Sequence, residues 1–358
     1  MFSILLSAAT VGAQEPAKDH VKTHVKSSSN ATDSAKPYHL PAFFESQDPI
    51  EVTLTTNIGN IRGDKGTDPP WRPATLAYRG QDGAPIIVPI KARTRGIWRL
   101  KTCNFPPLRL NFSGETSKGT IFHRLDKPKL VSYCQDMDSY EQYILQEYQL
   151  YRIYQLLTPF SHKARLLKFV YADSGNGKIR AKRYGFVMEE PGAVGARLGG
   201  KVLEQKGALP GDLDPFQDAL FGVFQYFIGN TDFSVAGLHN VELFFSNDGM
   251  VAPIAYDFDF AGAVNARYAV PDDRLRLQNV RQRLFRGYCT DDSAYAKVFA
   301  LFKDKKNDIY ALYSDSIGKL MDQGTVRETL SYFDGFYETI DDPRSARRSI
   351  TESCIGRN

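Results

Sequence analysis

The residues best suited to chemistry lie in one short stretch of the 358-residue chain, between Asn230 and Asp259. A helical pattern ends just before this stretch, which reads NTDFSVAGLHN, then VELFF, the turn SNDG and MVAPIAYDFDF. Its acidic and amide side chains include Asp232, Asn240 and Asp257. Carboxylate and amide oxygens are the ligands that Mg²⁺ prefers in proteins. The stretch therefore predicts a divalent-cation site beside a general base.

The two apolar runs on either side of SNDG predict a β-hairpin. With Asp248 and Gly249 as a two-residue loop, Asn240 lies directly opposite Asp257. With Asn247 and Asp248 as the loop, the same two side chains become diagonal neighbours on one face. Because both registers keep the amide and the carboxylate on the same side, we expect them to share a metal ion.

Phosphoryl transfer depends mainly on positioning and charge neutralisation, with metal-binding Asp and Asn side chains and a loop carboxylate near the acceptor hydroxyl. We therefore expect Asn240 and Asp257 to bind metal, Asp259 to hold a second ion from the same strand face, and Asp232 to act as base. The alternative is that Asn230 and Asp232 only shape the helix exit and that the later aspartates form an exposed strand end. Carboxylates placed between aromatic residues favour the functional interpretation, because unpaired buried charge is costly.

Several elements must position these residues. Alternating segments from Ile50 onward, EVTLTT, PIIVPIKART and LRLNF, predict an N-terminal antiparallel sheet. One main helix is predicted, capped by Asp138 and stopped by Pro159. ARLLKFVYAD and KIRAKRYGFVMEE then predict a hairpin, and the second half predicts mostly helices, of which the first is capped by Asp214 and ended by Gly229.

At this point the sequence resembles the CotH family of secreted atypical kinases over roughly residues 85–265. The catalytic half of the family pattern is matched by three segments, which are Asn230-Thr231-Asp232, His239-Asn240, and Tyr256-Asp257-Phe258-Asp259 followed by Ala261-Gly262. The N-terminal half is matched by Arg95-Gly96, LRLNF, KPKLV and FVMEE. The chain departs from the family after Arg95-Gly96, where it reads Ile-Trp-Arg in place of the usual Ser-Ser-Trp.

The resemblance implies an α+β, bilobal, protein-kinase-like fold, with an N-terminal antiparallel sheet plus one main helix in residues 46–190 and a mostly helical lobe in residues 191–358. It implies ATP as nucleotide, Mg²⁺ or Mn²⁺ as metal and a protein Ser or Thr hydroxyl as acceptor. Asp232 would be the catalytic residue, and Asn240, Asp257 and Asp259 the metal ligands.

The resemblance leaves the residue that anchors the phosphates open. Lys129, Arg109 and Lys101 are the candidates, each of which is otherwise a surface salt-bridge residue. Glu147, in the main predicted helix, would pair with the basic residue that anchors the phosphates. Glu190 matches a family position near the connection between the lobes, where the backbone would contact adenine. For Glu147 the alternative is an ordinary solvated helix position, and for Glu190 a structural role.

Three functions follow from these residues. The first is an exported, ATP-dependent protein Ser/Thr kinase. The second is another ATP-using transferase, acting on a sugar or small molecule. The third is a catalytically inactive surface or adhesion protein, although the presence of Asp232, Asn240 and Asp257 favours an enzyme.

The composition narrows the partners and the compartment. Hydrophobic residues make up 42% of the chain and the formal net charge is only +4, so we expect a folded monomer and no nucleic-acid partner. Residues 1–13 predict a signal peptide, with a buried strand as the alternative, and are too short to span a membrane. Residues 14–45 predict a flexible linker. We therefore expect a secreted, periplasmic or cell-surface protein.

The four cysteines show no spacing typical of a zinc site. In an oxidising compartment they can form two disulfides, and one bond within each half would join Cys103 to Cys134 and Cys289 to Cys354. The sequence alone does not fix this pairing, and free buried thiols are the alternative.

Overall fold

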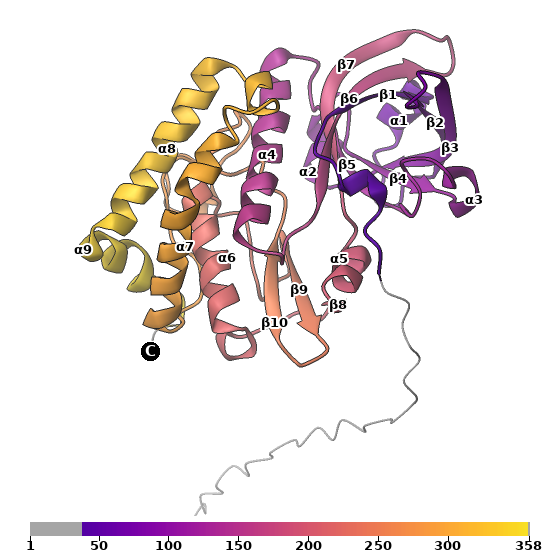
Figure 1. The fold of residues 1–358 in the computed structure, drawn as a ribbon. Helices are drawn as coiled ribbons and strands as arrows, with labels where there is room; N and C mark the ends of the chain where they lie inside the picture. The colour runs from indigo at the N-terminus through magenta and orange to yellow at the C-terminus, as the bar shows by residue number, and fades with distance from the viewer. Residues whose placement is uncertain (1–37, 357–358) are drawn as a thin grey trace, which may run out of the picture. The chain divides into compact units, whose positions relative to one another are not determined.

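Seven strands in the first half of the chain close into a barrel, as seen in the computed structural model, which describes residues 38–356 (Figure 1). Neighbouring strands follow the order β1-β2-β3-β4-β5-β7-β6, and β6 returns to β1. Their bounds are β1 Ile50–Thr56, β2 Arg72–Arg79, β3 Pro85–Thr94, β4 Leu108–Phe112, β5 Lys129–Val131, β6 Ala164–Asp173 and β7 Ile179–Met188.

The barrel corrects the predicted fold class. All neighbouring pairs are antiparallel except β1 with β6, which run parallel from the pair Ile50 and Leu167 to the pair Thr56 and Asp173. Alternation in the sequence correctly indicated strands, but it carries no information on which edges meet. The prediction of a bilobal kinase-like fold with a single antiparallel N-terminal sheet is therefore wrong, since the sheet is closed and mixed and a second sheet follows it.

The closure of the barrel is reinforced by Arg165 on β6. Its guanidinium donates to the carbonyl oxygens of Phe43 at 2.9 Å and of Asp48 at 3.1 and 3.2 Å. Phe43 and Phe44 are buried in the barrel core, so this last part of the predicted linker is packed against β6. The predicted signal peptide and linker residues 14–37 lie outside the described residues.

The second half combines a small sheet with helices (Figure 1). The strand order is β10-β9-β8, with β8 at Gly200–Leu203, β9 at Val241–Ser246 and β10 at Val251–Ala255. The helices of the described residues are α1 Ile58–Gly63, α2 Trp98–Thr102, α3 Gly114–Ser117, α4 Asp138–Leu157, α5 Pro191–Arg197, α6 Pro215–Ile228, α7 Asp292–Ala311, α8 Gln323–Asp341 and α9 Pro343–Ala346.

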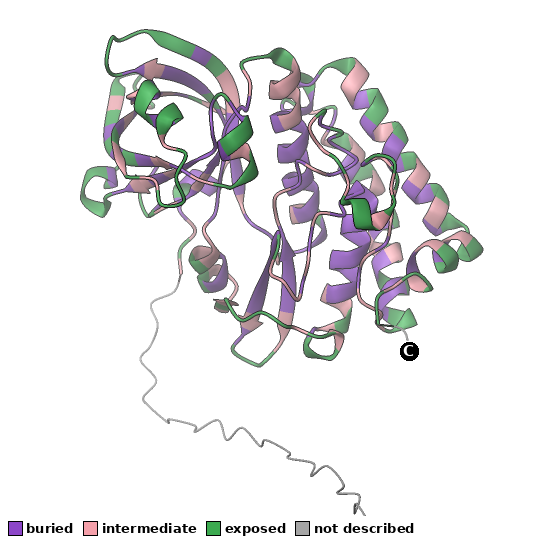
Figure 2. Cartoon of the chain, turned by 180° about the vertical axis from the view of Figure 1, so that it is seen from behind, coloured by how far each residue is buried: buried purple, intermediate pink, exposed green. Residues whose placement is uncertain are grey.

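Two helices that position the site agree with the sequence prediction. Helix α4 spans the predicted range, although Met137 rather than Asp138 is its N-cap. Helix α6 begins at Pro215 after the Asp214 cap and ends at Gly229, whose φ of 67° is left-handed. The rings of Tyr154 on α4 and Phe224 on α6 stack with centroids 4.3 Å apart. Both helices are mostly buried in the largest hydrophobic cluster (Figure 2).

Two disulfides join Cys103 to Cys134 and Cys289 to Cys354, one within each half of the chain. This is the pairing that would respect the two halves, and it excludes the alternative of free thiols. The division into lobes at residues 46–190 and 191–358 stays a prediction. No helix in residues 38–356 combines the length and apolar character that a membrane span requires.

Candidate functional site

The loop after α6 presents the predicted catalytic residue. The side-chain oxygen of Asn230 accepts the backbone N–H of Asp232, and Ser234 and His239 exchange two backbone hydrogen bonds of 3.0 Å that fold the loop back on itself. The Asp232 carboxylate then meets the Nε2 of His239 at 2.8 Å and the amide nitrogen of Asn240 at 3.1 Å. We call Asp232, His239 and Asn240 the loop group.

The loop group borders a large cavity. Its volume is about 1050 Å³, and the Asp232 and His239 side chains, 43% and 59% exposed, lie at its wall. Asn240 is buried and donates its amide nitrogen to both the carbonyl and the carboxylate of Asp232, which leaves its amide oxygen outside these two bonds. The other lining residues come mainly from the segment after β10 and are Thr231, Phe233, Ser234, Phe260, Val270, Pro271, Asp272, Asp273, Arg274, Leu275, Val280 and Arg286.

The predicted hairpin register is wrong by one residue. Val241 pairs with Ala255, so the position opposite Asn240 is Tyr256, whose N–H donates to the Asn240 carbonyl at 3.2 Å. The cause is a three-residue loop that ends at Gly249, whose φ is 93°, where a two-residue loop was predicted. Asn240 and Asp257 both adopt left-handed conformations just beyond the strand ends. The structure therefore places Asn240 with Asp232 rather than directly opposite Asp257.

Asp257 instead joins two other carboxylates. One ligand oxygen from each of Glu147, Asp257 and Asp259 lies within 4.8 Å of the others. We call these three residues the acidic cluster. Helix α4 holds the segment after β10 in place, because the N–H of Asp257 donates to the hydroxyl of Tyr151 at 2.8 Å and that of Phe258 to Glu147 at 3.3 Å.

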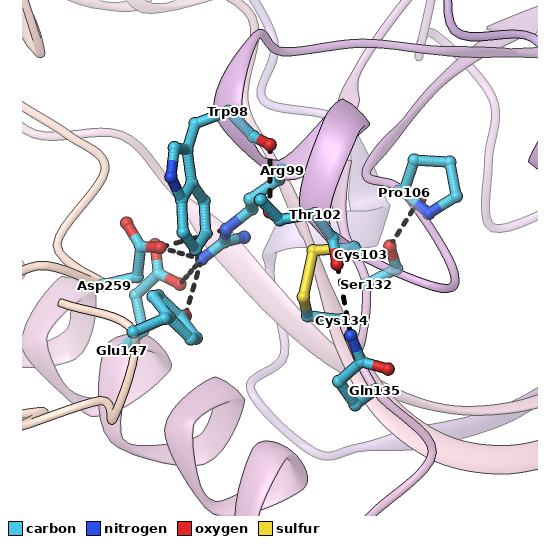
Figure 3. The surroundings of a disulfide bond; sticks show 11 residues. Trp98, Arg99, Thr102, Cys103, Pro106, Ser132, Cys134, Gln135, Glu147 and Asp259 are labelled. Atoms are coloured by element: carbon cyan, nitrogen blue, oxygen red, sulfur yellow. Dashed lines mark hydrogen bonds and ion pairs between the residues drawn. A yellow bond between two sulfur atoms is a disulfide. The ribbon is translucent and has the colours of Figure 1, made fainter.

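Arg99 on α2 links two members of the acidic cluster (Figure 3). Its Nη2 lies 2.6 Å from Asp259 and 3.4 Å from Glu147. The disulfide at Cys103 ties the end of α2 to Cys134, four residues before α4 begins. The crosslink therefore keeps Arg99 beside the carboxylate that α4 carries.

Electrostatics distinguish the three carboxylates. Burial raises the pKa values of Glu147 and Asp259, the proximity of Asp257 raises both further, and Arg99 opposes these effects. Because Asp259 is much closer to the Arg99 guanidinium, we assign the ionised state to Asp259 and the retained proton to Glu147. The Asp257 carboxylate makes no hydrogen bond or ion pair with other residues in the 38–356 range. A carboxylate without a hydrogen bond or ion pair, beside two more carboxylates, fits a hard divalent cation.

The predicted phosphate-anchoring residues lie in different places. Lys129 on β5 pairs with Arg109 on β4, and its Nζ lies 3.9 Å from Glu242 and 4.3 Å from the centre of the Tyr256 ring. Lys101 is exposed at the end of α2. Of the three candidates, the structure therefore places Lys129 and Arg109 side by side and Lys101 on the surface.

A second cavity of about 470 Å³ lies beside Lys129, because Glu242 and Tyr256 form part of its wall. Glu242 is held by His162, whose Nε2 lies 3.2 Å away. Burial alone would raise the pKa of Glu242, but His162 and Lys129 outweigh burial and lower it. Glu190 is the N-cap of α5, directly before the cavity-lining residues Pro191 and Gly192.

Sequence reasoning missed Arg99, Arg95, His162 and Glu242 as site residues. Arg95 was noticed only as part of the Arg95-Gly96 match to the family and Arg99 only in the departure that follows it, since the partners of both residues are far away in the chain. The signal for Glu242 was a charge inside the apolar run VELFF. No family model matches the chain, and no curated protein matches it.

Proposed function

We propose that this protein is an exported, ATP-dependent phosphotransferase of the CotH kind that uses a divalent metal and transfers phosphate to a Ser or Thr hydroxyl of a protein. The observation that carries the proposal is the acidic cluster, in which Glu147, Asp257 and Asp259 converge within 4.8 Å beside Arg99. Oxygen ligands in such an arrangement suit Mg²⁺ or Mn²⁺.

Different residues would carry out metal binding and proton transfer. Asp257, as the carboxylate without a hydrogen-bond or ion-pair partner among the described residues, would hold the metal with help from Asp259, which Arg99 keeps in place. A bound divalent cation neutralises charge on phosphate oxygens. Asp232, positioned by His239 and Asn240, would accept the proton of the acceptor hydroxyl.

The cavities support a nucleotide and a large acceptor. The 470 Å³ cavity beside Tyr256 has a size typical of small-molecule sites. Lys129 lies over the ring of Tyr256, so adenine bound in this cavity would lie close to Lys129. The 1050 Å³ cavity at Asp232 is larger than most small-molecule sites, which favours a peptide segment as acceptor. The two disulfides are compatible with an extracellular protein.

The proposal is tested with the full-length, oxidised protein and ATP labelled at the γ-phosphate. We expect metal-dependent transfer of label into a protein substrate such as casein, loss of transfer with EDTA, and loss in Asp232→Asn but not in Glu338→Gln, a charge-matched change at an exposed position of α8. Label that enters only sugars or small molecules would redirect the proposal to another transferase. Absence of metal-dependent nucleotide binding would refute the proposal.

A further inference from the structure

A small polar cavity of about 250 Å³ lies between residues 66–69 and the ends of β3 and β4. Three arginines line it, Arg93, Arg95 and Arg109, against one aspartate, Asp68. The lining therefore carries an excess of two positive charges. An excess of fixed charge in a concave site concentrates ions of opposite sign.

The three arginines are not equally satisfied. Arg93 pairs with Asp68 at 3.3 Å and lies over the ring of Trp71 at 4.6 Å. The guanidinium of Arg109 makes no direct hydrogen bond or ion pair with any described residue. The Nε of Arg95 is sealed from solvent and has no hydrogen-bond partner within residues 38–356. A buried donor without a partner is costly, so an acceptor is expected to bind there.

Arg95 also connects this cavity to the acidic cluster. Burial lowers the pKa of Arg95, while the nearby carboxylates of Asp257 and Glu147 raise it. Burial likewise lowers the pKa of Lys129, and Arg95 and Arg109 lower it further. Arg95 and Lys129 therefore lie within electrostatic range of the Asp257 carboxylate, and Arg95 and Arg109 lie within range of Lys129.

We propose that this cavity is an oligophosphate site in which Arg95 and Arg109 bind the phosphate groups of the nucleotide. The inference rests on the proposed function, because the nucleotide is the source of phosphates that it names. Guanidinium groups bind phosphate oxygens through charge-assisted hydrogen bonds. Because Arg95 lines this cavity and also interacts electrostatically with Asp257, phosphates bound there would lie near the carboxylate that would hold the metal.

The test measures binding of inorganic tripolyphosphate and of ATP to the full-length protein by calorimetry, without metal. Arg95→Met and Arg109→Met should each weaken tripolyphosphate binding roughly tenfold or more, because each loses a charge-assisted contact. Arg95→Lys should retain part of the affinity. Arg327→Met removes the same charge from an exposed position of α8 outside the cavity lining and should leave binding unchanged. Thermal melting without ligand checks that each variant is folded.

The two ligands separate the possible sources of phosphate. An equal loss of affinity for ATP and tripolyphosphate supports the nucleotide as the source. A loss for tripolyphosphate alone retains the anion site but overturns its assignment to the nucleotide. Failure of the wild-type protein to bind tripolyphosphate, or an equal loss in Arg327→Met, overturns the site. Phosphoryl transfer without any effect of the arginine variants would refute the site alone, and Arg95-dependent binding without transfer would refute only the proposed function.

Discussion

The side chain of Asp259 is 7% exposed and bonded to Arg99, whereas that of Asp232 is 43% exposed at the wall of a large cavity. The acidic cluster is fixed by a helix, an arginine and a disulfide-anchored segment. The loop group is fixed mainly by hydrogen bonds within one short loop. A buried, cross-braced set of carboxylates suits a bound cation, and an exposed carboxylate suits proton exchange with an acceptor.

The largest effect is expected at Asp257. Asp257→Asn should abolish metal-dependent ATP binding and reduce turnover below detection, because it removes the one cluster carboxylate that makes no hydrogen bond or ion pair among the described residues. The asparagine tolerates the left-handed φ of 64° at this position, so the backbone should be preserved. Thermal shifts with ATP, with and without Mn²⁺, measure the binding, with Glu338→Gln as control. Retained metal-dependent binding would contradict the assignment of the cluster.

The matching change in the loop group is Asp232→Asn. Nucleotide binding should be spared, while turnover falls by a factor on the order of 10² to 10⁴, as expected for loss of a general base. Initial rates and the ATP dissociation constant are measured on the same preparation. If this variant loses ATP binding as completely as Asp257→Asn, the two groups do not divide the work as described.

The role of Arg99 in the acidic cluster can be tested through the stability of the protein. Arg99→Met leaves Asp259 and Glu147 without their buried counter-charge and should lower the free energy of unfolding by about 3 kcal/mol in the absence of metal. Because a divalent cation can replace the lost charge, Mn²⁺ should raise the melting temperature more in the variant than in the wild type. Arg93→Met, which breaks an exposed pair, is the control and should cost less than about 1 kcal/mol. An Mn²⁺ shift that is equal in all three proteins would argue against a cation at the cluster.

Asp218 on α6 provides a buried carboxylate outside both groups. Burial raises its pKa from 3.8 to about 7, and its Oδ1 has no hydrogen-bond partner within the described residues. The folded state therefore holds a proton that the unfolded state loses, so stability falls as pH rises from 3.8 to about 7. Asp218→Asn removes this loss and should stabilise the protein at pH ~8 by at most about 4 kcal/mol.

Urea unfolding at pH ~5 and ~8 measures this effect, and the gain from Asp218→Asn should be smaller at pH ~5, where the wild-type side chain is protonated in the folded state. A variant that is less stable than the wild type at pH ~8 would mean that the Asp218 carboxylate is ionised and paired. The comparison shows whether burial without an arginine is enough to hold a proton in this core.

The parts that the sequence predicted correctly depend on local signals. Helix α6 was predicted from an Asp cap, a proline at the first turn and a terminal glycine. The contact between Asp232 and Asn240 was not predicted, because Asn240 was paired with Asp257 instead. The hairpin register failed because SNDG accommodates loops of two or three residues.

The non-local contacts escaped prediction. Arg99 meets Asp259 across 160 residues, and the parallel pairing of β1 with β6 depends on which edges find each other. Neither leaves a periodic signal in the sequence, because periodicity reports only the environment of neighbouring residues. The closed sheet was therefore missed while its individual strands were recognised.

The parallel pairing of β1 with β6 also sets an order of events as the chain is made. The carbonyl of Phe43 accepts a hydrogen bond from Arg165, which lies 122 residues later, so this bond can form only after Arg165 has been synthesised. Until β6 has been synthesised, β1 keeps an open edge that can pair with another chain. Non-local closures of this kind are slow. A chain truncated before residue 164 would therefore keep this edge of β1 open and be prone to aggregation.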